Sequence, residues 1–342
     1  MTKPNQSYDS LTDPPTNLKE AIDWVLRINE LKQLEQLAEA LNALLKRDVR
    51  DMAVRVKEVY EKICEKFCKD CEEHYNHASY LKQYLKKLPT FEPFQGSDDE
   101  TDEKMLEKLK GDSGNFKSSL SQLPDNLKKF LGYTSPNQFK DGIISSSHSY
   151  TFVYQDAEWN ADEATDYAVI LLAVVPMLFL GLGYTYVKCS QTKGTNKGWS
   201  DMKIKSHTIK NNGVSAFGDF LTGMGFHEGV LNGEKSGSEI HSQLSDFNDL
   251  KSTNASLTEH PYSFFKKLQN KALTSQPTSP SHPLTTIYRI SHYCISYPLY
   301  TVQSSNPVTP SFLGYSGPAA LAGGAYGFNL GGINTFMSAL LA

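Results

Sequence analysis

The chain has 342 residues, of which 39% are hydrophobic, and its formal net charge is −4. This length can bury a sizeable core and corresponds to about two domains at ~150 residues each. The near-neutral charge gives no argument for a nucleic-acid partner or for attraction to an anionic membrane surface. The polar N-terminus lacks the apolar run and cleavage site of a classical secretory signal peptide.

The N-terminal quarter of the chain predicts a helical scaffold. Residues 1–16 form an extended lead-in, since proline disfavours helix in the residue before it. Asn17 is suited to cap a helix, and Glu20 completes a capping box three positions later. Apolar residues then recur at helical spacing without an intervening Gly or Pro. We expect residues 17–88 to form two or three antiparallel helices, or one coiled-coil-like rod with a turn near 47–51.

Beyond this scaffold the sequence predicts a linker and a second domain. Residues 89–103 are acidic and loop-like, which indicates a solvated linker. Residues 104–342 are expected to form a mixed, mainly helical domain with weak strand candidates at 142–144 and 150–154. Asp, Glu, Lys and Arg are absent from 290–342, and the chain stops within an apolar pattern, so we expect a C-terminal truncation. The predicted fold class is mainly α: a long helical bundle or coiled-coil-like region, then a helical domain around a very apolar central helix.

That central helix is predicted from Tyr167 to Val187, a stretch without a charged residue, His, Asn or Gln. Its roughly 20 uncharged residues meet the length needed to cross a bilayer. A helix buried on every side by a protein core has the same composition. Pro176, in the middle, is tolerated in either setting. Acidic residues precede the stretch and lysines follow it, so a single span would place the N-terminal half outside the cytoplasm.

The five cysteines are the first candidates for chemistry. Cys64, Cys68 and Cys71 lie close together in the sequence, whereas Cys189 and Cys294 stand alone. An odd number leaves at least one thiol without an intramolecular disulfide partner in an oxidising compartment. In a reducing compartment all five can be small buried apolar groups. They are therefore candidates for a disulfide or thiol cluster, and they do not settle the compartment.

The spacing Cys64-x-x-x-Cys68-x-x-Cys71 is the one with which radical S-adenosylmethionine enzymes hold an iron–sulfur cluster. Asp70 stands where that family usually has an aromatic residue, and the motif lies inside a helical pattern instead of following a strand. A zinc site that adds His74 is the other metal alternative, although structural zinc commonly uses two separated ligand pairs. Thiols on one helix face, buried or paired with a facing helix, are the simpler interpretation.

Other motifs of catalysis are absent from the sequence. The histidines show no metal-ligand spacing, and the nucleophile elbow, the P-loop and the dinucleotide fingerprint are missing. We therefore assign no catalytic, cofactor-binding or metal residue and expect a non-enzymatic protein without a cofactor. The polar segments 95–103, 191–210 and 275–282 are the expected contact loops, because exposed loops commonly carry recognition. A compact amphipathic helix is expected to end at Gly225 in the left-handed conformation.

Several strings resemble one protein family. Residues 10–27 (SLTDPPTNLKEAIDWVLR) are similar to the N-terminal signature of the variant erythrocyte surface antigens of piroplasm (Babesia-type) parasites. Further strings similar to that family are the block from Tyr154 to Trp159 before the apolar helix that ends at Cys189, the Lys197-Gly198-Trp199 loop, the block from Phe217 to Phe226, and the glycine-rich segments 317–319 and 324–332. Together they span nearly the whole chain.

The resemblance implies an antigen on the surface or membrane of the infected erythrocyte, with roles in antigenic variation, immune evasion and adhesion to host endothelium. Its implied partners are a host endothelial receptor or an antibody, and a family hetero-oligomer. Family members are longer, with a membrane span near the C-terminus and a Gly-rich insert soon after Arg27, so we expect a truncated or short member. In the family, 167–187 lies in the displayed region, which favours a buried helix. The alternatives are a single-span structural membrane protein and an iron–sulfur enzyme.

Overall fold

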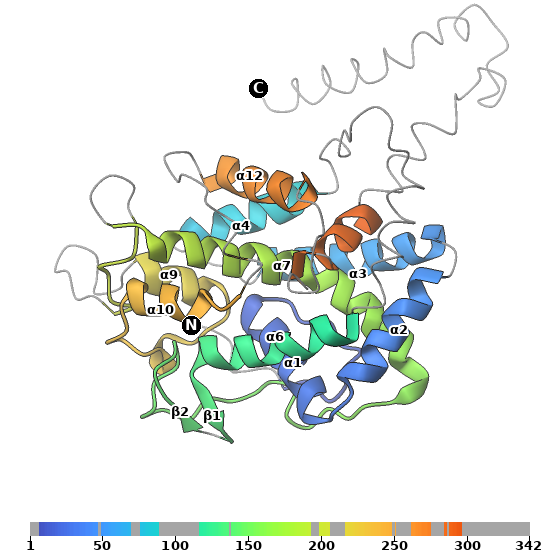
Figure 1. Ribbon diagram of the computed structural model, residues 1–342, viewed down its shortest axis with the longest axis horizontal. Helices are drawn as coiled ribbons and strands as arrows, with labels where there is room; N and C mark the ends of the chain where they lie inside the picture. The colour runs from blue at the N-terminus through green and yellow to red at the C-terminus, as the bar shows by residue number, and fades with distance from the viewer. Residues whose placement is uncertain are drawn as a thin grey trace, which may run out of the picture. The chain divides into compact units, whose positions relative to one another are not determined.

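The computed structural model is mainly α-helical, and its described residues include one small antiparallel pair of strands (Figure 1). It describes residues 7–46, 49–69, 76–88, 116–136, 138–192, 198–205, 216–247, 250, 261–274, 284–285 and 287–295. All of these residues belong to one compact unit, Met1–Ser296.

The α-helices lie on both sides of the chain's most apolar segment. In chain order they are α1 (Leu18–Glu30), α2 (Leu34–Lys46), α3 (Val49–Lys69), α4 (Asn76–Lys87), α6 (Phe116–Leu131), α7 (Ala164–Ser190), α9 (Ala216–Gly223), α10 (Gly237–Leu244) and α12 (Pro261–Thr274). Short 3-10 turns are η3 (Ala161–Glu163) and η4 (Glu228–Val230), and the strands are β1 (Tyr133–Ser135) and β2 (Gln138–Phe139). Residues 287–295 are also helical.

Helix α1 begins where the sequence predicts, at the Asn17 cap. The Asn17 side chain accepts a hydrogen bond from the amide of Glu20 at 2.9 Å. The Glu20 carboxylate in turn accepts the amide and the hydroxyl of Thr16, at 2.7 and 2.8 Å. The return contact of the expected capping box therefore reaches the residue before the cap.

The predicted scaffold over 17–88 divides into four helices, α1 to α4, one more than the largest number expected. Between α1 and α2, Lys32 has a φ of 59°, and the amide of Gln33 bonds to the carbonyl of Ile28 at 3.0 Å. These features are those of a Schellman motif, which usually has Gly where this chain has Lys32. Helix α2 ends at Lys46 and α3 begins at Val49, so residues 49–51 of the turn predicted near 47–51 are helical, and residues 47 and 48 lie outside the described residues. Neither the long bundle nor the coiled-coil-like rod is confirmed.

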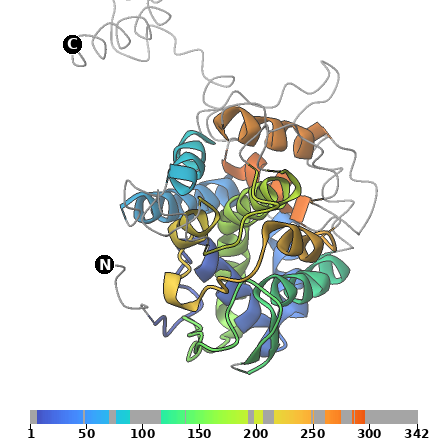
Figure 2. The same cartoon turned by 90° about the vertical axis from the view of Figure 1, so that its left-hand side faces the viewer.

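Helix α7 is the core of the described fold. It contacts α1, α2, α3, α4, α10 and α12, and Figure 1 shows it running between α4 and α12 on one side and α1 and α6 on the other. Figure 2 shows the same order from the side. Every residue from Tyr167 to Thr185 is buried, including Pro176, which has no N–H to donate to the carbonyl of Leu172.

Among the described residues, one helical segment, Ala161–Ser190, is long and apolar enough to cross a membrane, and its apolar window is entirely buried. Length and composition do not distinguish a span from a core helix. In this fold the neighbouring helices cover α7, and its apolar window is buried. The structure thus agrees with the buried helix favoured for 167–187.

Short loops complete the fold around this helix. The strand candidates at 142–144 and 150–154 are not ladder strands; β1 and β2 form the pair instead, and Ile144 makes an isolated bridge with Leu231. Helix α9 ends as predicted, since Gly225 has a φ of 99° and the amide of Phe226 bonds to the carbonyl of Leu221.

Candidate functional site

Three of the five candidate cysteines are buried thiols. Cys64 lies in α3, Cys189 in the last turn of α7 and Cys294 in the helical segment 287–295. Burial raises the pKa of Cys189 well above its usual value and that of Cys294 to about 12. A thiol held in its protonated form is a poor nucleophile and a poor metal ligand, so the environments of Cys189 and Cys294 are structural.

The three-cysteine motif is only partly inside the described residues. Cys64 is 7% exposed, and it lies beside Tyr60, whose pKa is raised by burial and further by Cys64. Cys68 is in the helix, and Cys71 and His74 lie outside the described residues. Within the residues that were described, three metal-ligating side chains are nowhere grouped together.

The predicted contact loops fall mostly outside the described residues. That holds for 95–103 and 275–282, whereas 191–210 is described at 191–192 and 198–205. In this loop Trp199 is fully buried and stacks on Phe217 at 4.9 Å between ring centroids. The Trp199 ring also meets Tyr184 of α7 edge-on at 5.7 Å. Trp199 therefore belongs to the core, whereas Asp201 and Lys203 of the same loop are exposed.

A buried polar network joins α1 to the segment before η3. The Lys19 ammonium donates to the Asp23 carboxylate at 2.7 Å and to the carbonyl of Thr151 at 3.0 Å. Asp23 also accepts the Tyr150 hydroxyl at 2.7 Å and the Val153 amide at 3.1 Å. Burial raises the pKa of Asp23, and these three donors oppose the shift. Each oxygen of the carboxylate has a donor, which is how a buried charge is accommodated.

A second set of contacts ties the N-terminal lead-in to the same segment. Tyr8 stacks on Tyr154 with 4.6 Å between ring centroids, and its amide donates to the carbonyl of Val153 at 2.7 Å. The Tyr8 hydroxyl donates to Glu20 at 3.0 Å, and the Tyr154 hydroxyl donates to the carbonyl of Asp13 at 2.8 Å. These bonds hold residues 7–17 in place as a strap over the start of α1.

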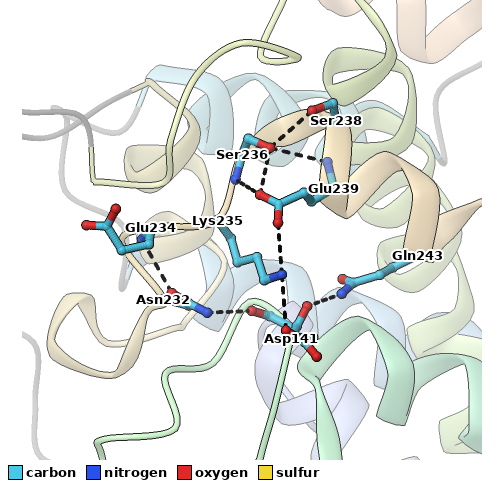
Figure 3. A network of polar contacts seen from close by, with 9 residues as sticks. Asp141, Asn232, Glu234, Lys235, Ser236, Ser238, Glu239 and Gln243 are labelled. Carbon is cyan, nitrogen blue, oxygen red and sulfur yellow. Dashed lines mark hydrogen bonds and ion pairs between the residues drawn. The ribbon is translucent and has the colours of Figure 1, made fainter.

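The surface network in Figure 3 joins two loops to the N-terminus of α10. Ser236 caps the helix with Glu239 in a full capping box, and Lys235 lies 3.0 Å from Glu239 and 3.5 Å from Asp141. Donors from Ser236 and Lys235 lower the pKa of Glu239 to about 2. The Gln243 amide donates to the carbonyl of Asp141. Because each of these groups is used in helix capping or in joining the loops, the network is structural.

A third network lies inside the fold, between α4, α12 and residues 287–295. The Tyr84 hydroxyl donates to the Gln269 side-chain oxygen, and the Gln269 nitrogen bonds to Nε2 of His292. Gln269 is 3% exposed and His292 is 4% exposed. Burial lowers the pKa of His292 to about 4. A neutral histidine is therefore enclosed in the core.

Sequence reasoning found the cysteines but neither buried network. The signal for the first was available, because Lys19 and Asp23 are four residues apart on a helix with apolar neighbours. The Tyr84–Gln269–His292 chain has no such signal in the sequence. Tyr84 and Gln269 are 185 residues apart, and Gln269 and His292 are 23 residues apart.

Comparison of the chain with protein-family models, curated proteins and solved structures returns no match. The resemblance to the variant surface antigens therefore stays a prediction from the sequence.

Proposed function

We propose that the chain is a non-enzymatic variant surface antigen of an intraerythrocytic parasite, displayed on the infected red cell. Its role would be recognition, in antigenic variation and in adhesion of the infected cell to host endothelium. The partners would be a host endothelial receptor and antibodies, with hetero-oligomers of family members as a further assembly. No cofactor is part of this proposal.

The observation that supports it is the meeting of three family-like strings in the folded chain. Arg27, which ends the first string, donates through Nε to the carbonyl of Ala157 at 2.9 Å, in the second string. The amide of Lys19 donates to the carbonyl of Met224 at 3.1 Å, in the block from Phe217 to Phe226. These contacts join residues that are 130 or more positions apart in the sequence. Their contacts are those expected of a common framework.

The division between framework and loops fits a variable antigen. The family-like strings supply buried side chains such as Trp24, Tyr154, Trp199 and Phe217, which a fold needs to keep. The predicted contact loops 95–103 and 275–282 lie outside this framework in the sequence. Loops on a rigid scaffold tolerate sequence change better than the core does.

The decisive experiment asks which part of the chain is accessible on intact infected cells. The chain is tagged at its C-terminus, the cells are treated with protease, and the fragments are identified with the tag and with antibodies to residues 7–46. Cleavage without lysis is the expected result. Full protection of the tagged chain on cells whose known surface proteins are cut would end the proposal.

Two alternatives have their own tests. A single-span structural membrane protein requires α7 to leave its neighbours, and recovery of a monodisperse protein without detergent would contradict it. An iron–sulfur enzyme requires Cys64, Cys68 and Cys71 to ligate a cluster. Anaerobic reconstitution of the folded chain with iron and sulfide would then give cluster absorbance, and the C68S variant would not.

A further inference from the structure

The buried Tyr84–Gln269–His292 chain has a direction that depends on the protonation of its histidine. The Tyr84 hydroxyl is a donor to the Gln269 oxygen, so the Gln269 nitrogen faces His292 and donates to Nε2. Nε2 must therefore carry a lone pair, which requires a neutral imidazole with its proton on Nδ1. In this orientation of the Gln269 amide, a proton on Nε2 would place two donors against each other. Reversal of the amide, with the Tyr84 hydroxyl as acceptor, would remove that clash but would leave the positive charge of a doubly protonated imidazole buried.

The surroundings of His292 offer no counter-charge among the described residues that contact it. Its recorded neighbours are Gln269 of α12, and Tyr288 with ring centroids 6.2 Å apart. Tyr288 in turn stacks on Phe179 of α7 at 4.7 Å. Tyr84 reaches the histidine from α4 through Gln269, and Tyr288 contributes to the raised pKa of Tyr60 in α3. These titratable neighbours are neutral near pH 7 and below, so a positive charge on His292 would be buried without a carboxylate.

His292 also lies where α12 and residues 287–295 pack against α4 and α7. Helix α12 contacts α4 and α7, with Leu268 against Gly183 of α7 and Phe265 beside Tyr84. Residues 287–295 add Tyr288 on Phe179, and the Arg289 side chain donates to the carbonyl of Leu273 at 2.7 Å. The Gln269–His292 bond thus joins α12 to the last described helical segment.

We propose that His292 is an acid-sensitive latch, and that its protonation releases α12 and residues 287–295 from α4 and α7. Release would uncover buried apolar side chains of α12, among them Phe264, Phe265 and Leu268. In the closed form, Val54 is the one large apolar side chain that is exposed within the described part of the chain. Acid would therefore add an apolar face to the described part of the fold.

The size of the effect follows from linkage. The ordinary pKa of His292 is 6.5 and burial lowers it to about 4, so the open form takes up the proton first as the pH falls. The equilibrium constant for release of α12 and residues 287–295 should rise about 30-fold between pH 7.5 and pH 5, and should level off below pH 4.

The test is hydrogen exchange of the full chain at pH 7.5 and pH 5, corrected for the intrinsic exchange rate. Peptides from 261–274 and 287–295 should lose protection at pH 5, while peptides from α1 and α6 keep it. Equal loss in all peptides would mean global acid unfolding and would overturn the latch. Unchanged protection of 261–274 and 287–295 would overturn it as well.

Two variants separate the latch from a merely structural contact. H292Q keeps a neutral amide at the position and should abolish the response between pH 7.5 and pH 5. Q269E is nearly isosteric and supplies the missing carboxylate, so the 30-fold response should fall to a few-fold at most. A full acid response in either folded variant would contradict the proposal.

Discussion

The side chain of Asn17 lies against the backbone of Gly225, where the start of α1 meets the end of α9. A methyl group on Gly225 would come within 2.3 Å of the Asn17 side-chain oxygen, the atom that caps α1. The neighbouring residues reinforce the contact, because the Lys19 amide donates to the carbonyl of Met224 at 3.1 Å. One glycine thus ends one helix and makes room for the cap of another.

Replacement of Gly225 by alanine should destabilise the protein by about 2–4 kcal/mol. The φ of 99° is unfavourable for an L-residue, and the added methyl group would displace the Asn17 cap. Urea unfolding measured by circular dichroism gives the change in free energy.

Gly229→Ala is the matched control for this prediction. Its added carbon would meet the His227 side chain at 3.0 and 3.1 Å, and Gly229 is not among the described glycines with positive φ. We expect a loss below about 1 kcal/mol. Equal losses of unfolding free energy for G225A and G229A would show that the close contact of Gly225 with Asn17 does not matter for stability.

The helices with regular signals could be predicted from the sequence. The cap at Asn17 and the left-handed end at Gly225 each follow from a local rule. The break at Lys32 was missed because a lysine occupies the position where glycine usually marks a Schellman motif. Helix ends could therefore be predicted where a residue type typical of a cap, such as Asn or Gly, occupies the position.

The buried networks could not be predicted in the same way. Asp23 is satisfied by Tyr150 and by the amide of Val153, and nothing in the local sequence says which distant donors will meet a carboxylate. The apolar stretch shows the same limit. Its composition suits both a membrane and a core, and only its contacts with six other helices distinguish the two.

Asp23→Asn should destabilise the fold by about 3–5 kcal/mol, because it leaves the Lys19 ammonium buried without a counter-charge. The Lys19 and Asp23 side chains are 6% and 0% exposed, so water cannot solvate the ammonium that has lost its carboxylate partner. Addition of Lys19→Met to the Asp23→Asn variant should recover part of the loss. Chemical unfolding of the four chains gives the coupling energy.

The surface pair between Lys57 and Glu61 provides the comparison. Its atoms are 3.9 Å apart and the Glu61 side chain is 59% exposed, so Glu61→Gln should change stability by less than about 1 kcal/mol. A loss for Asp23→Asn no larger than that for Glu61→Gln would refute the role of the buried pair.

The buried thiols should be inert in the native protein. In a C68S/C71S variant the remaining cysteines are Cys64, Cys189 and Cys294, all buried. Ellman's reagent should therefore detect no rapidly reacting thiol at pH 8, and three after unfolding in guanidinium. Rapid reaction of even one thiol in the folded variant would show that its helix opens or is placed differently.

Glu239 should make the stability of α10 depend on pH. Its carboxylate accepts the amide and hydroxyl of Ser236, and its pKa is lowered from 4.5 to about 2. A carboxyl whose folded pKa is lowered adds stability above its unfolded pKa and loses it as the pH falls through the folded value. The contribution of Glu239 to the free energy of unfolding should thus be complete above pH 5 and should decline from pH 4.5 toward pH 2.

The measurement is the difference in urea midpoint between the wild-type chain and Glu239→Gln from pH 7 to pH 3. Because both chains contain His292, its acid response cancels in the difference. At pH 7 the variant should be less stable by roughly 0.5–1 kcal/mol, the range for a capping contact, and the gap should narrow below pH 4.5. Ser238→Ala, which removes only a 3.1 Å contact with Ser236, should give a difference that does not change with pH. A gap for Glu239→Gln that stays constant down to pH 3 would show that the carboxylate charge does not hold the cap.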